Sequence, residues 1–127
     1  MEFNLAEINE VIAAAIPDRE MMVWRDRRLT YAQVAERTRR LANYLHGRGL
    51  GAKRERADLA GWESGQDHVA LYLYNCPEYI EGMLGAYKSR TAPFNVNYRY
   101  VEEELVYLLR DSKARAIIYH AAFAPTL

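Results

Sequence analysis

The heptapeptide HVALYLY, at residues 68–74, decides the fold because nearly every position in it is apolar. A strand with one solvated face alternates apolar and polar residues, whereas a strand that helices cover on both faces reads as a continuous apolar run. Pro77 follows where a helix would begin, and proline is well tolerated at the first helical position. The segment therefore predicts a buried strand that leads into a helix.

Strands and helices continue to alternate towards the C-terminus. Apolar periodicity predicts a helix over 78–89, a short strand at 92–96, a helix at 102–110 and a strand at 115–119. Strands and helices that alternate in this way form a parallel sheet with right-handed crossovers. Residues 68–127 are therefore expected to form a β-α-β-α-β unit. The apolar stripes of its two helices are Ile80, Met83, Leu84 and Tyr87, and Leu105, Val106, Leu108 and Leu109.

Residues 1–51 are expected to form a helix, a hairpin and a second helix. Asn4 can cap the first helix, over 5–16, and Pro17 ends it. The apolar run 21–24 meets Leu29 across a charged turn, which predicts the hairpin. The first helix is amphipathic, with an apolar stripe at Leu5, Ile8, Val11, Ile12 and Ala15.

The second helix begins at a capping box, in which Thr30 is followed by Gln33. From 52 to 67 the residues are mostly charged or small and the periodicity vanishes, which predicts a long surface loop whose role stays open. The helix has its apolar positions at Val34, Thr38, Leu41, Ala42 and Leu45, and Gly47, Gly49 and Gly51 mark its end.

Composition and charge exclude several classes of protein. Seventeen Lys and Arg balance seventeen Asp and Glu, so there is no global attraction for nucleic acid. The lone Cys76 cannot form an internal disulfide and no leader peptide opens the chain, which favours a cytoplasmic protein. The sequence contains no run of eighteen apolar residues, so no segment is expected to span a bilayer.

Most residues that could carry chemistry have a structural explanation. The sequence around Ser64 misses the nucleophile motif G-x-S-x-G by one position, so we expect a solvent-facing serine. Cys76 is expected to cap or pack a helix. The three histidines are far apart and lack ligand-spaced partners, and Glu102–Glu104 suit the positive end of a helix. The sequence thus assigns no catalytic, cofactor-binding or metal-binding residue; the histidines are His46, His68 and His120.

One local charge asymmetry is present between residues 19 and 56, where eleven basic residues stand against four acidic ones. Such a stretch could contact an anionic partner, either a membrane surface or an acidic cosubstrate. The more ordinary explanation is that these arginines solvate the outer face of the second helix.

Three segments together resemble the N-terminal portion of the AMP-forming acyl-coenzyme A synthetases, which are adenylate-forming enzymes. The first is Leu29-Thr30-Tyr31 with the helix that follows, the second is the strand and helix over 69–85, and the third runs from Ala92 to Ser112. Within the third, Asn-Val-Asn-Tyr-Arg-Tyr at 95–100 is most similar to bacterial fatty-acid and sterol-side-chain ligases. The loop at 52–67 is longer than the usual link in this family.

The resemblance implies the fold, the cofactors and the partner. It implies an α/β fold with a partial parallel sheet, as the N-terminal part of the large domain of a ligase that uses ATP, magnesium and CoA. The family's catalytic motifs would then lie beyond Leu127, so the chain is expected to be an inactive fragment whose partner is the rest of the polypeptide. Tyr98 and Arg99 are the candidates for substrate contact, although a structural tie between loop and sheet explains them as well.

Two alternatives come from other classes. The chain could be a free-standing flavodoxin-like domain that holds a nucleotide or flavin at its strand ends, or an interaction module that uses its arginine-rich face. The acyl substrate, a homo-oligomer and the enzymatic status of the chain stay open at this point.

Overall fold

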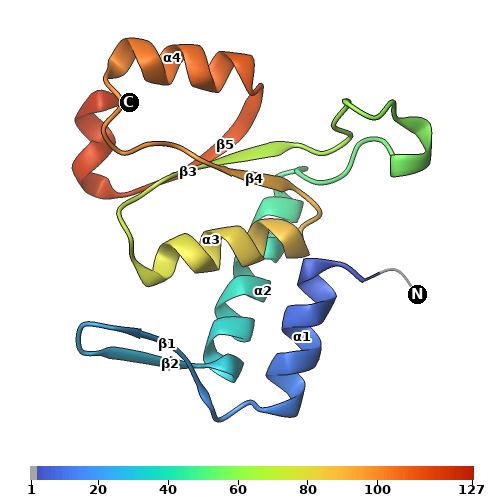
Figure 1. The fold of residues 1–127 in the computed structure, drawn as a ribbon, viewed down its shortest axis with the longest axis vertical. Coiled ribbons are helices and arrows are strands. Elements are labelled where there is room, and N and C mark those ends of the chain that lie inside the picture. The colour runs from blue at the N-terminus through green and yellow to red at the C-terminus, as the bar shows by residue number, and fades with distance from the viewer. Residues whose placement is uncertain (1–2) are drawn as a thin grey trace.

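Three strands, β3 (His68–Tyr72), β4 (Ala92–Asn95) and β5 (Ala114–Tyr119), form a parallel sheet in the order β4-β3-β5. The structure is a computed structural model and describes residues 3–127. The helix α3 (Pro77–Lys88) covers one face of the sheet, and α4 (Glu102–Asp111) lies on the other (Figure 1). The predicted alternation of strands and helices is therefore confirmed.

The central strand β3 is buried on both faces, as its apolar run predicts. Successive side chains of a strand point to opposite faces. Ala70 and Tyr72 pack with Leu105 of α4, while Val69 and Leu71 belong to the cluster under α3. All four side chains are at most 1% exposed, so burial on two sides explains why polar residues are missing from this segment.

Helix α3 faces the core with a different stripe from the predicted one. Ile80 is exposed, and the other three predicted positions are only half-buried. A Cβ at Gly82 would lie 3.0 Å from Leu71 Cδ2, and one at Gly85 would lie 2.6 Å from Leu41 Cδ2. The helix thus approaches its neighbours through its smallest residues, which hydrophobic periodicity does not weigh. The residues of α3 that are buried are Pro77, Glu81, Gly82, Gly85 and Ala86.

The N-terminal half contains α1 (Leu5–Ala15), an antiparallel hairpin of β1 (Glu20–Trp24) and β2 (Arg27–Thr30), and α2 (Tyr31–Gly47). The predicted caps are confirmed: Asn4 Oδ1 accepts from Glu7 N at 2.9 Å, and Thr30 and Gln33 form a reciprocal capping box. The predicted stripe of α2 is buried at Val34, Thr38, Ala42 and Leu45, and Leu41 is half-buried against α3.

The apolar stripe of α1 is not the face that packs. Leu5 and Val11 are 56% and 69% exposed, and Ile8 and Ile12 are exposed as well, whereas Asn9 and Ala13 are buried. Helix α1 contacts α2 and α3. It is attached there by Glu10, whose carboxylate pairs with Arg39 of α2 and Lys88 of α3. The charged pairs, rather than the apolar stripe, thus decide how α1 is rotated.

The long loop at 52–67 is closed and internally bonded. Its ends meet at a β-bridge between Ala52 and Gln66, and Lys53 N donates to Gly65 O at 2.7 Å. A short 3-10 helix, η1 (Arg56–Asp58), forms its tip, and a second, η2 (Ala121–Thr126), follows β5. The loop projects away from the amino end of β3 (Figure 1). Among residues 3–127, no helix is both long and apolar enough to cross a membrane.

Candidate functional site

The candidate site lies at the edge of the sheet where the parallel strands have their carboxyl ends. Ligands of open parallel sheets usually bind beyond this edge, on the segments that follow the strands. Tyr74 follows β3, Tyr98 follows β4 and His120 follows β5. The topology thus brings together three residues that lie far apart in the sequence.

Aromatic rings occupy this edge. The Tyr74 ring centroid lies 5.2 Å from those of Tyr98 and His120, and 4.6 Å from that of Phe123 in η2. Phe123 in turn stacks on the buried ring of Tyr72 at 4.4 Å. Ring pairs at such distances are mutually attractive. The edge is therefore an ordered aromatic platform, continuous with the core.

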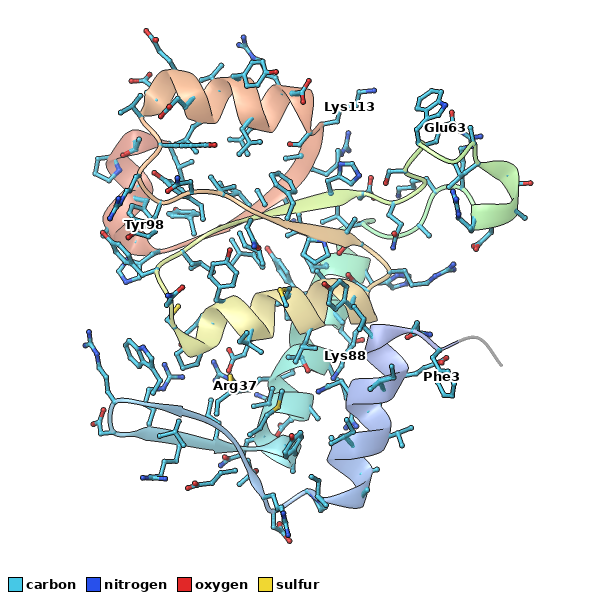
Figure 2. The ribbon with its side chains drawn as sticks, in the orientation of Figure 1. Phe3, Arg37, Glu63, Lys88, Tyr98 and Lys113 are labelled. Atoms are coloured by element: carbon cyan, nitrogen blue, oxygen red, sulfur yellow. The ribbon has the colours of Figure 1, made fainter. Side chains whose placement is uncertain are left out.

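Tyr98, one of the two candidates from the sequence, is at this edge (Figure 2), and Arg99, the other candidate, is the next residue in the chain. Arg99 Cζ lies 5.7 Å from the Tyr98 ring centroid, and the Arg99 backbone N–H donates to Asn97 Oδ1 at 3.0 Å. The Tyr98 side chain contacts Tyr74 and is 43% exposed. The geometry ties the β4–α4 connection to the end of β3.

A cavity of about 600 Å³ opens beside the platform, between the hairpin, the start of α3 and the end of β5. Arg27 Nη1 crosses it to reach Glu78 Oε1 at 2.7 Å. The cavity could not be predicted from the sequence because its walls come from three separate segments. The signal that could have indicated it is the position of Tyr74 and His120, since both residues follow strands. The walls include Trp24, Arg25, Arg27, Tyr74, Cys76, Glu78 and His120.

The pKa values of two titratable groups in this cavity are shifted in opposite directions. Burial and the nearby Glu78 raise the pKa of the Cys76 thiol above its ordinary value. Burial is also the largest single influence on Glu78 and opposes its ionisation, but the hydrogen bonds from Arg27, the Glu78 backbone N–H and Cys76, together with the Arg27 charge, outweigh burial and lower the pKa of that carboxyl. Cys76 is therefore a protonated, half-buried thiol at the start of α3, packed against the core cluster under that helix. This agrees with the packing role expected from the sequence.

The other residues weighed from the sequence have structural contacts. Gly47 is the last residue of α2, and Gly49 has a φ of +79°, so the glycines end a helix as predicted. Glu104 Oε2 accepts from Val101 N at 3.0 Å at the start of α4. His120 Nδ1 accepts from Ala122 N at 3.1 Å. In residues 3–127 no group of three or more His, Cys, Asp or Glu could hold a metal ion.

The structure adds contacts to two of the expectations. Ser64 is exposed, as expected, but its hydroxyl oxygen lies 2.7 Å from His68 Nε2, so it is a bonded serine and not merely a solvated one. The arginine-rich stretch is largely engaged in ion pairs, several of them with carboxylates from α1 and α3, instead of only facing solvent. The arginines in such pairs are Arg27, Arg28, Arg37, Arg39, Arg40 and Arg54.

Comparison with known proteins identifies relatives over nearly the whole chain. A family model described as AMP-binding enzyme matches residues 10–126. The medium-chain acyl-CoA ligase Mig of Mycobacterium avium is 58% identical over 97% of this chain and 22% of its own length. A 3-oxocholest-4-en-26-oate–CoA ligase of Rhodococcus rhodochrous is 36% identical over 98% of this chain and 20% of its own. The chain thus spans about a fifth of the length of these relatives.

Solved structures agree with this. The N-terminal domain of FACL13 from Mycobacterium tuberculosis superposes with a TM-score of 0.83 at 27% identity, covering 98% of this chain and 29% of that one. The matched region includes the sheet, both covering helices and the hairpin.

Proposed function

The chain belongs to the family of AMP-binding enzymes, and from that premise we propose that it supplies the N-terminal part of the large domain of an ATP-dependent acyl-CoA ligase. The single observation that carries this proposal is the 58% identity to a medium-chain acyl-CoA ligase over 97% of the chain. The comparisons give no support to a free-standing flavodoxin-like domain.

The proposed reaction has two steps. A fatty-acid carboxylate attacks the α-phosphate of ATP and pyrophosphate leaves, which forms an acyl-adenylate. The thiol of CoA then attacks the acyl carbon and AMP leaves. We propose a medium-chain fatty acid as the substrate, because identity to the medium-chain ligase is 58%, against 36% to the sterol-side-chain ligase. A sterol side chain is the second candidate.

This chain's own contribution would be positional. The buried strand β3 and the helices on both its faces fix the carboxyl edge, so the segments after the strands are held in register. We propose that Tyr98 and Arg99 tie the β4–α4 connection to this edge, which their contacts with Tyr74 and Asn97 support. Charge in such transition states must be met by donors that are already in place.

Magnesium, ATP and CoA are implied by the family. Residues 3–127 offer no cluster of metal-binding side chains, so no step of the reaction is assigned to a metal site on this chain. We propose that the partner of the chain is the remaining part of a ligase polypeptide. A cytoplasmic location is proposed because ATP and CoA are used there and because Cys76 is a free thiol.

A chimera tests the proposal. The matching segment of the M. avium ligase is replaced by this chain, and ATP–pyrophosphate exchange is measured with octanoate, palmitate and a sterol-side-chain acid. We expect exchange with octanoate within about tenfold of the parent ligase, because 58% identity preserves the packing surfaces.

A matched control chimera carries Gly85→Leu, which forces a bulky side chain against Leu41 and should abolish both folding and exchange. A chimera that folds cooperatively and yet is inactive with every carboxylate would contradict the proposal.

A further inference from the structure

We propose that Ser64 and His68 form a nucleophile–base pair that cleaves small, activated carboxylic esters. The pair lies at the amino end of β3, on the opposite edge of the sheet from the aromatic platform. In Figure 2 the neighbouring Glu63 and the platform residue Tyr98 lie at opposite ends of the sheet. The proposed activity is thus separate from the ligase reaction.

The hydrogen bonds of His68 determine where its proton is. Nδ1 lies 2.5 Å from the backbone carbonyl oxygen of Ser112, which can only accept, so Nδ1 carries the proton. In the neutral imidazole Nε2 is then unprotonated and accepts from the Ser64 hydroxyl at 2.7 Å. A serine, a basic nitrogen bonded to it and a third group that orients the base are the elements of an activated nucleophile.

The loop around Ser64 is held in place. A Cβ at Gly65 would lie 2.3 Å from the backbone oxygen of Arg54, so the loop is closed as tightly as a glycine allows. The Gly65 carbonyl accepts from the backbone N–H groups of Lys53 and Arg54. On the other side, His68 is half-buried in β3, with its ring 6.5 Å from that of Phe94. Both partners therefore come from fixed backbone, which favours a maintained contact.

Ser64 is accessible from a polar cavity of about 500 Å³. Three arginines line this cavity, and Arg56 among them donates to the Ala60 carbonyl and forms no ion pair within residues 3–127. Attack on an ester creates a negatively charged oxygen, and a nearby cation stabilises that charge. The backbone N–H of Gln66 donates to Ser64 Oγ at 3.4 Å, which helps to orient the hydroxyl oxygen.

The proposed hydrolysis proceeds through an acyl-serine. Ser64 Oγ bonds to the ester carbonyl carbon while its proton moves to His68 Nε2. The bond from that carbon to the leaving oxygen then breaks, and the departing alcohol takes the proton from His68. Water repeats the sequence on the acyl-serine, releases the carboxylic acid and restores the hydroxyl.

The first experiment treats the chain with a fluorophosphonate, with fluoride as the leaving group, and maps the adduct by mass spectrometry. We expect one adduct, on Ser64, that is lost in Ser64→Ala and forms at least about tenfold more slowly in His68→Asn. Ser89→Ala is the matched control, because it removes another serine hydroxyl, one that is buried against Ala86 and Thr91 and does not contact His68. It should be labelled at the wild-type rate.

The second experiment measures hydrolysis of p-nitrophenyl acetate by the same variants, with circular dichroism to confirm that each is folded. The rate of hydrolysis should fall to the buffer rate in Ser64→Ala. The proposal is overturned if Ser64 is not labelled, if folded His68→Asn reacts at the wild-type rate, or if Ser64→Ala hydrolyses the ester as the wild type does.

Discussion

Arg37 of α2 and Glu81 of α3 form a two-point ion pair, with Nε to Oε1 at 2.5 Å and Nη2 to Oε2 at 2.9 Å. The Glu81 side chain is only 9% exposed, whereas that of Arg37 is 47% exposed. The hydrogen bond that Arg37 donates to Glu81 raises the pKa of Arg37 above its ordinary value. The pair joins residues that are 44 positions apart and fixes the rotation of α3 on α2.

Arg37→Met is therefore expected to lower the free energy of unfolding by about 2 kcal/mol, because it leaves a buried carboxylate without its partner while water reaches the vacated side. Urea denaturation measures the change. Arg40→Met is the matched control: its pair with Glu36 is exposed on both sides, and loss of such a pair changes stability by less than about 1 kcal/mol. Equal effects in the two variants would disprove a special role for Glu81.

Gly85→Ala is expected to destabilise the chain by about 1–3 kcal/mol, because the added methyl group meets Leu41 at 2.6 Å. Thermal and urea denaturation measure this. Gly47→Ala is the control, since nothing lies within 4 Å of its Cβ position and alanine favours a helix by up to about 1 kcal/mol. The double variant Leu41→Ala with Gly85→Ala should recover part of the loss. If the double variant loses more stability than the two single variants lose together, steric contact is not the cause.

Glu10 should make stability depend on acid pH. The hydrogen bond from Arg39 is the largest influence on its carboxyl, and with Lys88 it lowers the pKa despite partial burial. When a carboxyl has a lower pKa in the folded chain than in the unfolded chain, its ionised form stabilises the fold. This stabilisation is fully present at pH values above the pKa of the unfolded chain, and it is lost as the pH falls through the pKa of the folded chain. Glu10→Gln should therefore flatten the loss of stability between about pH 5 and pH 3.

At neutral pH the same variant should be less stable by about 1–2 kcal/mol, because the Lys88 side chain, 6% exposed, keeps only Thr38 as a partner. Denaturation at each pH measures both effects. Glu55→Gln is the control, since the Glu55–Arg90 pair is fully at the surface and should change neither curve measurably. A Glu10→Gln curve parallel to that of the wild type would contradict the assignment.

Substitutions at Tyr98 test whether this side chain only ties the β4–α4 connection to the sheet or also contacts a substrate. Tyr98→Ala should reduce stability by about 1 kcal/mol through loss of the ring contact with Tyr74. Tyr98→Phe keeps the ring and should leave the melting temperature unchanged. In the ligase chimera, Tyr98→Phe should also leave the KM values for ATP and acid unchanged; a raised KM at an unchanged melting temperature would show that the hydroxyl contacts a substrate.

The isolated chain is expected to show no ATP–pyrophosphate exchange with any carboxylate. The reason is that the chain matches only about a fifth of the length of the acyl-CoA ligases that resemble it. Exchange above background, abolished by heat, would contradict this prediction. The measurement is independent of ester hydrolysis at Ser64, so either result can stand without the other.

Much of the fold could be predicted because its signals are local. The apolar run of β3, Pro77 at the start of α3 and the Thr30–Gln33 capping box all act within a few residues. The predicted strands and helices accordingly agree with the structure to within a residue or two. The rotation of the helices could not be predicted in this way. Periodicity marks large apolar side chains, but α3 packs through Gly82 and Gly85, and α1 is attached by the ion pairs of Glu10.

For the candidate sites too, some features depend on neighbours along the chain and others on tertiary contacts. The sequence by itself determined the order of strands and helices, the two-sided burial of β3 and the resemblance to adenylate-forming enzymes, because these depend on neighbours along the chain. Only the tertiary structure decided that Tyr74, Tyr98 and His120 share one edge and that Ser64 bonds a histidine held by the Ser112 carbonyl. The physical reason is that parallel strands bring distant segments to a common edge. The contacts of Tyr74 with Tyr98 and His120 and the contact of His68 with Ser112 span 24 to 46 residues and leave no periodic trace in either segment. Ser64 and His68 are only four residues apart, and the folding of the loop before β3 decides their contact.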